Sequence, residues 1–346
     1  MTYWLFLFVR LALHRQVMDE TKFNLPLSLV VAVKNNTQGI QQLVQKIQKQ
    51  NHKNWEMVIV SDGEDEALKA FIAGCANQKI RLLISDGQGK KHAIAQGVAA
   101  AVNDWVLVTD SDCLPSSLRY FDTMAASLKN SKTQIVLGYA PLRVKGSFIS
   151  RLAGYEASYI AMQYLSYALA GMPYMGVGRN MLFDRALYLK NRQNLFDNGL
   201  VSGDDDMFVQ AAANAENTAI CFHPYTHCVS DAPESLTTWF RQRQRQNTTA
   251  SFYRLRHKIL LGVFAALHLG VYFTMLIGLV IGQLSLSQTV VWLTLMGLMS
   301  ALQYPIFRKL NASGNLLLTP LADVFLAGFY TALAFKLNPQ KQYPWK

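Results

Sequence analysis

The N-terminal half of the chain alternates continuous apolar runs with segments whose apolar residues recur every three or four positions. Short β-branched runs are typical of buried strands, and the three-to-four spacing is typical of helices with one buried face. This alternation predicts an α/β domain with a mostly parallel sheet flanked by helices. The predicted strands span residues 27–33, 55–60, 80–84, 105–110 and 135–137.

An acidic run interrupts the pattern further along the chain. Asp204, Asp205 and Asp206 precede an apolar helical segment at residues 207–213. Ser202 or Asp204 is predicted to cap this helix, and acids in a first turn interact favourably with the helix dipole. Three successive aspartates exceed what capping requires. A carboxylate that takes a proton from an attacking hydroxyl is therefore an equal alternative.

Two other segments between the strands and the C-terminus carry distinctive residues. The turn Gly176–Asn180 contains two glycines, which permit a close approach of the backbone to another group. Residues 237–246 form a helical pattern that alternates Gln with Arg, and this helix is either a basic surface or part of a site.

The C-terminal part of the chain is markedly apolar. Residues 259–282 and 286–307 are each long enough to cross a bilayer, and Arg308 and Lys309 follow the second segment. These two segments predict a transmembrane hairpin with a basic cytoplasmic flank.

A third apolar segment, residues 316–335, contains Asp323. An Asp near the centre of a spanning helix costs about 2.5–3.5 kcal/mol, whereas each Leu returns about 0.3–0.6 kcal/mol. We therefore expect an interfacial or re-entrant helix, or one that pairs with the N-terminal segment. That N-terminal segment, residues 1–13, is too short to span and contains Arg10, so it is predicted to be interfacial or marginally anchored.

Composition agrees with a membrane protein. The chain of 346 residues is 51% hydrophobic and has a net charge of +11, and its densest basic cluster, between Arg241 and Lys258, adjoins the first apolar segment. Anionic lipid attracts such a cluster, so nucleic acid is not the expected partner. We expect a multi-pass protein of the cell (inner) membrane whose catalytic domain is cytoplasmic. The predicted units are residues 1–23, 24–250 and 251–346.

The four cysteines form no regular disulfide pattern and are expected to be reduced. Cys221, His223, His227 and Cys228 raise the possibility of a zinc site. Their spacing matches no usual paired-ligand pattern, so two short strands without a metal are the favoured interpretation.

The strand at residues 105–110 ends at an acidic pair, Asp110 and Asp112. Carboxylate oxygens at the carboxyl end of a buried strand suit a hard divalent cation, Mg²⁺ or Mn²⁺. Such a cation would neutralise a diphosphate leaving group.

Polar residues also follow the other predicted parallel strands. Ligands of open α/β sheets bind beyond the carboxyl ends of the strands, so these groups are expected to converge on one crevice. The chain lacks a Walker or dinucleotide-binding glycine motif, so a phosphate-containing ligand bridged by a metal is the better hypothesis. The converging residues are Lys34, Asn35, Asp62 and Asp86, with Gly87, Gly89, Lys90 and Lys91 beside them.

Five of these motifs, in this order, resemble those of the family 2 glycosyltransferases, which have the GT-A fold and use nucleotide-diphospho-sugars. The resemblance covers about residues 25–246. The matching segments are Val31–Asn36, Val60–Gly63, Gly89–Ala93, Thr109–Asp112 and Gly203–Asp205, and Gln242–Gln246 lies where membrane-bound members carry Q-x-x-R-W.

The resemblance implies roles for individual residues. Asp205 would be the catalytic base, and Asp110 and Asp112 would hold the metal. Asn35, Asp62, Lys90 and Asp110 would bind the nucleotide-sugar, and Gln242, Arg245 and Asp204 would position the diphosphate or the acceptor.

These roles imply an inverting transfer of a sugar, with a UDP-sugar as the expected donor, to a hydroxyl of a lipid-linked or glycan acceptor at the membrane. The expected pathway is synthesis of a cell-envelope glycan or glycolipid. Two alternatives remain: a catalytically silent membrane scaffold and a processive polysaccharide synthase. Gln246 replaces the Trp of the processive enzymes, and Ser61 replaces the first Asp of the nucleotide motif.

Overall fold

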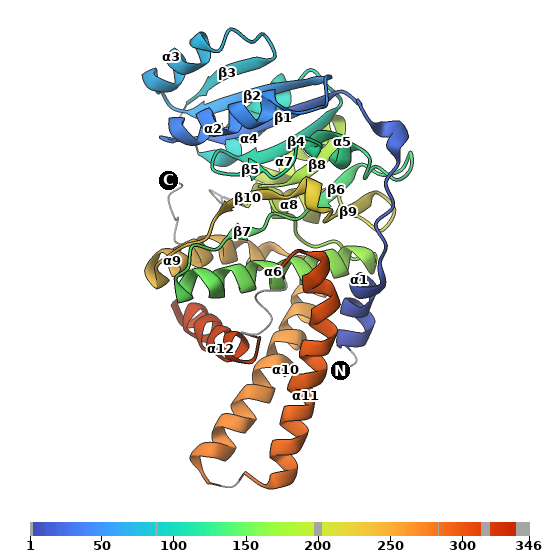
Figure 1. Cartoon of the computed structure of the whole chain (residues 1–346), viewed down its shortest axis with the longest axis vertical. Coiled ribbons are helices and arrows are strands. Elements are labelled where there is room, and N and C mark those ends of the chain that lie inside the picture. Colours follow the sequence, from blue (N-terminus) through green and yellow to red (C-terminus); the bar gives the residue numbers. More distant parts are fainter. Residues whose placement is uncertain (1–2, 87–88, 197–202, 283, 313–318, 337–346) are drawn as a thin grey trace.

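The computed structural model describes residues 3–86, 89–196, 203–282, 284–312 and 319–336. Its centre is a seven-stranded sheet with the strand order β3-β2-β1-β4-β8-β6-β9 (Figure 1). The four strands β1 to β4 are parallel, as the sequence predicts. The strands of this sheet are β1 (Leu27–Val33), β2 (Trp55–Asp62), β3 (Ile80–Ser85), β4 (Trp105–Asp110), β6 (Ile135–Gly138), β8 (Met181–Asp184) and β9 (Thr218–Cys221).

Both faces of the sheet are buried, which explains the continuous apolar runs. Val30 on β1 lies opposite Val58 on β2, and both belong to one core cluster. The next residue back, Leu29, belongs to the cluster on the other face. The first face is covered by α4 (Lys90–Ala100), α6 (Phe148–Leu169), α7 (Arg185–Phe196) and α8 (Asp204–Ala212), and the second by α2 (Thr37–Gln48), α3 (Glu66–Gly74) and α5 (Tyr120–Ala125).

The sheet becomes mixed on one side of β4. Strand β8 pairs antiparallel with both β4 and β6, whereas β6 and β9 are parallel. A smaller sheet of β5 (Leu114–Pro115), β10 (Cys228–Asp231) and β7 (Leu142–Arg143) lies beside it. The two short strands predicted around the cysteine–histidine segment are therefore β9 and β10.

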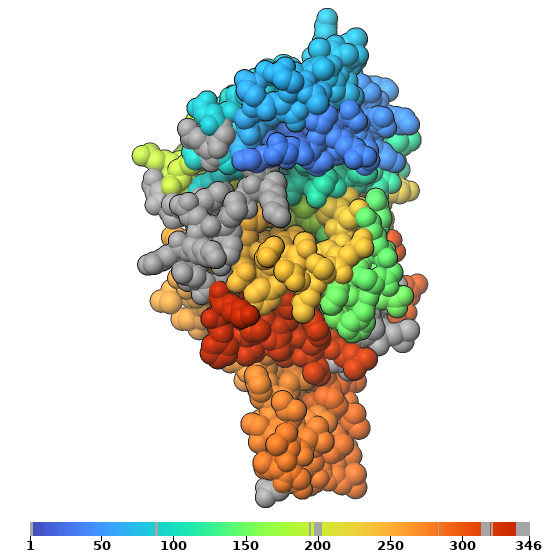
Figure 2. All heavy atoms as spheres, turned by 90° about the vertical axis from the view of Figure 1, so that its left-hand side faces the viewer, coloured from blue at the N-terminus to red at the C-terminus, as the bar shows by residue number. Residues whose placement is uncertain are grey.

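A layer of three helices separates the sheet from a projecting hairpin (Figures 1 and 2). These helices are α6, α9 (Leu236–Asn247) and α12 (Thr319–Lys336), and Figure 2 shows α12 between α9 and the hairpin. The hairpin is α10 (Leu255–Val280) and α11 (Leu286–Lys309), and both of its helices are long and apolar enough to cross a membrane. The 3₁₀ segment η4 (Thr248–Phe252) connects α9 to α10.

The N-terminal residues form a helical pair, the π-helical η1 (Trp4–Phe8) followed by α1 (Val9–Leu13). The pair packs on α6 and α11, and Lys309 donates hydrogen bonds to the carbonyl oxygens of Leu11 and His14. The alternative that the third apolar segment pairs with the N-terminus is wrong, because the main helix contacts of α12 are with α6, α9 and α10. Two further 3₁₀ turns are η2 (Glu20–Lys22) and η3 (Pro224–Thr226).

The predicted side-chain cap of the acidic helix is also wrong. Helix α8 begins at Asp204, and its cap residue is Gly203, whose φ of 88° is left-handed and which offers no side chain. Ser202 lies outside the described residues. A Cβ on Gly203 would lie 2.0 Å from the methyl carbon of Thr249, so the close approach of η4 requires glycine here.

The cysteines are free thiols, as predicted. Cys221 and Cys228 are buried in the core, and among the described residues neither belongs to a group of potential metal ligands.

Candidate active site

The acidic pair lies at the carboxyl end of β4, where the sequence places it. Ligand atoms of Asp110, Asp112 and Cys113 all lie within 4.8 Å of one another. Burial raises the pKa of the Cys113 thiol well above its usual range, so the thiol stays protonated and is a weak ligand. The ligands that remain are carboxylate oxygens, which fit Mg²⁺ or Mn²⁺.

The two carboxylates are crowded. Desolvation in the crevice and the neighbouring Asp110 both raise the pKa of Asp112. A bound cation would offset this repulsion, so the donor set fits the predicted metal.

Lys90, the second residue of the matching segment Gly89–Ala93, lies between the acidic pair and the acidic run. Its ammonium donates to Oδ1 of Asp110 at 2.5 Å. Burial opposes its charge, but Asp110, Asp204 and Asp205 outweigh that effect and raise the pKa of Lys90 above the ordinary lysine value. Lys90 is thus a permanent cation between the two groups of carboxylates.

Asp62 anchors the loop that presents Lys90. The Asp62 side chain is buried, and its Oδ1 accepts hydrogen bonds from the backbone N–H of Gly89 (2.8 Å) and from Ser85 (3.2 Å). Lys34 donates to Oδ2 at 3.0 Å. Burial raises the pKa of Asp62, but these hydrogen bonds outweigh it and hold the pKa below its usual range.

The backbone of the glycine-rich turn Gly176–Asn180 closely approaches the acidic run, as its glycines permit. Oδ2 of Asp205 accepts a hydrogen bond from the backbone N–H of Gly178 at 2.7 Å. A Cβ on Gly178 would lie 3.1 Å from that oxygen, so a side chain here would press on the carboxylate. The turn therefore orients Asp205.

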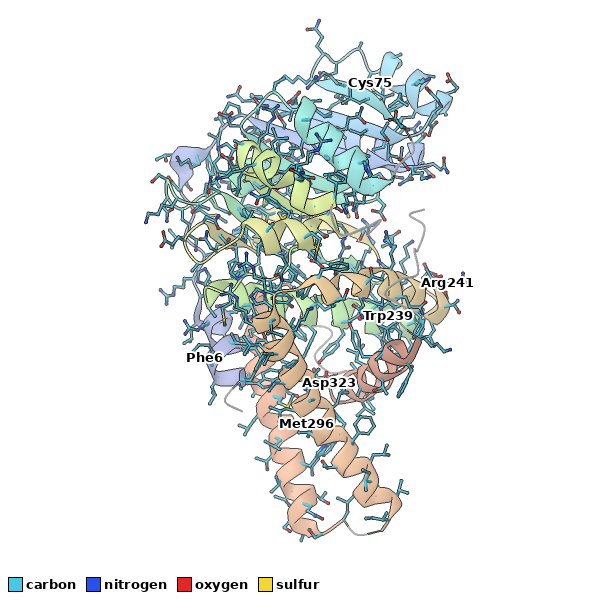
Figure 3. The ribbon with its side chains drawn as sticks, turned by 180° about the vertical axis from the view of Figure 1, so that it is seen from behind. Phe6, Cys75, Trp239, Arg241, Met296 and Asp323 are labelled. Carbon is cyan, nitrogen blue, oxygen red and sulfur yellow. The ribbon has the colours of Figure 1, made fainter. Side chains whose placement is uncertain are left out.

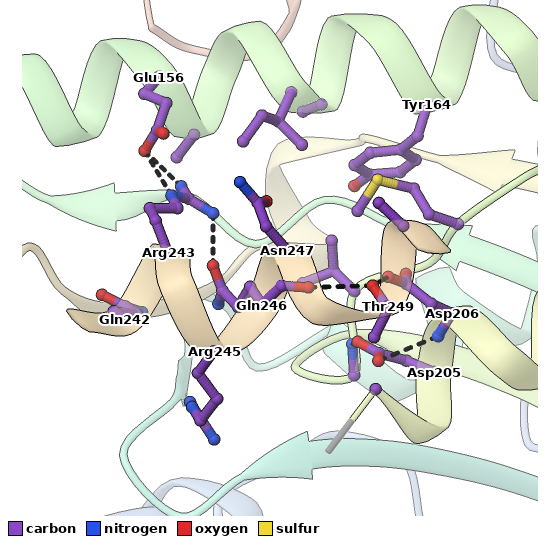
Figure 4. Close-up of a pocket in the computed structure, with 18 of the residues that line it drawn as sticks. Glu156, Tyr164, Asp205, Asp206, Gln242, Arg243, Arg245, Gln246, Asn247 and Thr249 are labelled. Carbon is purple, nitrogen blue, oxygen red and sulfur yellow. Dashed lines mark hydrogen bonds and ion pairs between the residues drawn. The ribbon is translucent and has the colours of Figure 1, made fainter. Parts of the chain in front are cut away.

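The other two aspartates of the run are buried. Burial, and next to it the charge of Asp205, raise the pKa of Asp206 to about 8. Its Oδ2 accepts a hydrogen bond from Thr249 at 2.7 Å (Figure 4). The same oxygen accepts a second hydrogen bond from Tyr253 at 2.7 Å. Burial and Asp205 also raise the pKa of Asp204 to about 6, although Lys90 opposes this rise. Asp206 is therefore a structural clamp between α8 and η4.

Helix α9 directs its arginines to different sides. Arg243 donates from Nε to Oε2 of Glu156 on α6 at 2.7 Å, and Trp239 donates to the same oxygen at 2.8 Å. Figure 4 shows Arg245 on the opposite side of α9, as a spacing of two residues on a helix requires. Among the described residues, no carboxylate pairs with Arg245, so its charge is available to a ligand.

One cavity of about 1130 Å³ collects most of the predicted site. Asn35 and Asp62 do not line it: Asn35 has a left-handed φ of 52° and an exposed side chain, and Asp62 acts through Gly89. The predicted site residues that line the cavity are Lys90, Asp110, Asp112, Asp204, Asp205, Gln242 and Arg245.

Arg179 also lines this cavity, although it is not among the site residues predicted from the sequence. Its guanidinium donates to Ser230 at 2.6 Å and to the carbonyl oxygen of Ala140 at 3.3 Å. Its charge opposes the rise of the pKa of Asp112. Its position directly after the second glycine of the turn is the signal that points to it.

The arrangement of sheet and helices is that of the GT-A fold of glycosyltransferases. A mannosyltransferase from Pyrobaculum calidifontis, solved in complex with GDP-Man and Mn²⁺, superposes with a TM-score of 0.58 over 94% of each chain, at 17% sequence identity.

The chain belongs to glycosyltransferase family 2: residues 25–249 match the family described as "Glycosyltransferase like family 2". An uncharacterised glycosyltransferase of Rickettsia felis is 24% identical over 197 residues, 55% of this chain and 30% of the relative. A poly-β-1,6-N-acetyl-D-glucosamine synthase of Staphylococcus aureus is 22% identical over 222 residues, 63% of this chain and 53% of the relative. The matched region thus covers 30% of the first relative's length and about half of the second's.

Proposed function

We propose that this enzyme transfers a sugar from a nucleotide-diphospho-sugar, a UDP-sugar in the first instance, to an acceptor hydroxyl at the cytoplasmic face of the cell membrane. The observation that carries the proposal is the position of Lys90 between Asp110 and the run Asp204–Asp205. Metal ligands, a cation for phosphate and a candidate base thereby share one cavity.

Each group has a chemical task in this proposal. Asp110 and Asp112 would hold Mg²⁺ or Mn²⁺, which supplies charge stabilisation for the departing diphosphate. Lys90 and Arg245 bind the phosphates and hold the leaving group in place. Asp205 accepts the proton of the acceptor hydroxyl, and that oxygen displaces the nucleoside diphosphate from the sugar in a single, inverting step.

The proposed membrane location is supported by the hairpin. Helices α10 and α11 project away from the catalytic sheet, and Arg308 and Lys309 end α11 on the side that faces it. Basic flanks favour the cytoplasmic side of a membrane, so the cavity opens where cytoplasmic nucleotide-sugars are available.

A silent scaffold is the alternative from another class of protein. It has no need for the Asp110–Asp112 pair, for Lys90 and for an oriented Asp205 in the same cavity. The processive synthase is an alternative with the same chemistry, and the length of the product distinguishes it from a single transfer.

The test is donor binding by the purified protein in detergent, measured by calorimetry across a panel of nucleotide-sugars with Mn²⁺, with Mg²⁺ and with chelator. We expect metal-dependent binding of one donor. Asp110→Ala abolishes this binding, and Asp104→Ala, an exposed aspartate before the other end of β4, leaves it unchanged. A folded protein that binds no donor in any metal would support the scaffold instead.

A further inference from the structure

The candidate active-site cavity continues past the acidic groups into a chamber between α6, α10 and α12. Most of the side chains that line this chamber are apolar. They include Ile160 on α6, Leu261, Phe264 and Leu269 on α10, and Leu326 and Leu333 on α12. The cavity is therefore amphipathic, with carboxylates and cations at one end and hydrocarbon at the other.

The two acidic side chains that line the chamber, Glu156 and Asp323, already accept hydrogen bonds from neighbouring side chains. Glu156 accepts hydrogen bonds from Arg243 and Trp239, as described above. Asp323 accepts from Tyr155 at 2.7 Å and from Tyr272 at 3.0 Å. Figure 3 places Asp323 where α12 meets the hairpin. These groups have little hydrogen-bonding capacity left for the hydroxyls of a glycan.

A buried hydroxyl in the chamber has no partner in the part of the chain that the structure describes. The hydroxyl of Tyr159 is buried and has no hydrogen-bond partner among the described residues, and the Tyr159 side chain lines the same chamber. Such a group costs free energy unless it meets an acceptor atom. An ether or ester oxygen of a ligand would supply that atom.

The helices that enclose the chamber present apolar side chains on their outer surfaces as well. On α10, Leu267 is 64% exposed and Leu276 is 55% exposed, and on α12, Leu321 is 67% exposed. Apolar helix surfaces of this kind are suited to contact with lipid. The apolar end of the cavity thus adjoins the part of the molecule that would contact the bilayer, which is where hydrocarbon chains are available.

We propose that the acceptor is a lipid, whose hydroxyl-bearing head reaches Asp205 while one hydrocarbon chain occupies the chamber between α6, α10 and α12. This inference rests on the proposed function and narrows it, because it selects a lipid over a glycan polymer as the acceptor. A growing polysaccharide would need free polar groups along its path, and the chamber offers mainly hydrocarbon.

The test uses dodecyl β-glucoside that carries a photoreactive diazirine at the end of its chain. The protein is held in nanodiscs of phosphatidylethanolamine and phosphatidylglycerol, irradiated and mapped by peptide mass spectrometry. We expect labels on the inward residues Leu261, Leu269 and Leu326 in addition to the outward residue Leu267. Labels confined to outward residues would overturn the inference.

Matched variants make the test specific. Ala265→Trp fills the chamber from an exposed position that tolerates a larger side chain, and Ala327→Phe fills it from α12. Each is expected to reduce inward labelling roughly tenfold, because overpacking displaces the chain. Leu267→Trp, on the outer face of α10, is expected to leave inward labelling unchanged. Inward labelling that survives both filling variants would also contradict the inference.

Donor binding, measured separately, tells the two hypotheses apart. Donor binding without inward labels means that the acceptor lipid inference alone fails, and a glycan acceptor becomes the better hypothesis. Inward labels without binding of any donor mean that the proposed function fails, while the chamber remains a site for a hydrocarbon chain.

Discussion

The backbone N–H of Gly178 donates a hydrogen bond to Oδ2 of Asp205 at 2.7 Å, so a turn between α6 and β8 fixes the orientation of the candidate base. The contact joins two segments that are distant in the sequence. A Cβ at residue 178 would lie 3.1 Å from the same oxygen, so a side chain there would force the carboxylate to shift by a few tenths of an ångström. Orientation of Asp205 is therefore open to a test that leaves the carboxylate itself unchanged.

We expect Gly178→Ala to lower turnover roughly tenfold, because small displacements of a catalytic group are costly in rate. Donor affinity should stay near that of the unmodified enzyme, since the donor ligands lie elsewhere. Gly74→Ala is the matched control, because a Cβ at Gly74 meets nothing within 4 Å. Steady-state kinetics with the donor found by calorimetry would measure both, and equal turnover in the two variants would contradict the orienting role.

Asp205→Asn tests the base directly. A general base contributes about 10² to 10⁴ in rate, so we expect this variant to fold, to bind donor and to lose at least about two orders of magnitude in turnover. Donor binding by calorimetry is the internal control, because it shows that the cavity is intact. Turnover close to normal in a donor-binding sample would assign the base to another residue.

The buried ion pair between Arg243 and Glu156 should contribute to stability. Glu156→Gln leaves the guanidinium of Arg243, whose side chain is only 14% exposed, without its counter-ion. Breaking a fully buried pair typically costs about 3–5 kcal/mol, which is an upper bound here. We expect a clearly lowered thermal unfolding midpoint, measured by intrinsic fluorescence in detergent. Glu216→Gln is the matched control. It breaks an exposed ion pair in which the side chain of Glu216 is 74% exposed and that of Lys132 is 71% exposed, so it should not measurably change the unfolding midpoint. Similar midpoints for both variants would show that α9 is held by other contacts.

Much of the sheet was predictable from the sequence because its strands are buried on both faces. Val30 and Leu29 point to opposite core clusters, so the run around them had to be continuously apolar. Strand β8 was not predicted, because Met181–Asp184 has only four residues and leads directly into a helix. Its antiparallel insertion depends on partners in β4 and β6 that periodicity does not reveal.

The candidate site was predictable where a motif ends a strand, as at Asp110. It was less predictable where side-chain direction decides the role. The alternation of Gln and Arg in α9 does not show that Arg243 is buried against Glu156 while Arg245 is available to a ligand. Likewise, the sequence does not show that Asn35 has a left-handed backbone in the turn after β1, or that it does not line the cavity.

Asp206 should make the stability of the folded protein depend on pH, and the structure predicts the direction of this dependence. Burial and Asp205 raise the pKa of Asp206 to about 8 in the folded protein, against 3.8 as its ordinary value. Between these values the folded state binds more protons than the unfolded state, so stability falls as pH rises from about 4 to about 8. The slope for one proton is at most about 1.4 kcal/mol per pH unit.

Asp206→Asn removes this titration and keeps an oxygen that accepts from Thr249 and Tyr253. The variant should therefore gain stability relative to the unmodified protein as pH rises from 5.5 to 7.5. Thermal unfolding midpoints of the two proteins, measured side by side in one detergent, give the difference in stability at each pH. The contributions of most other titrating groups cancel in this difference, because both proteins contain those groups. A difference that stays constant over this range would mean that Asp206 is already ionised in the folded protein, with Thr249 and Tyr253 sufficient to stabilise its charge.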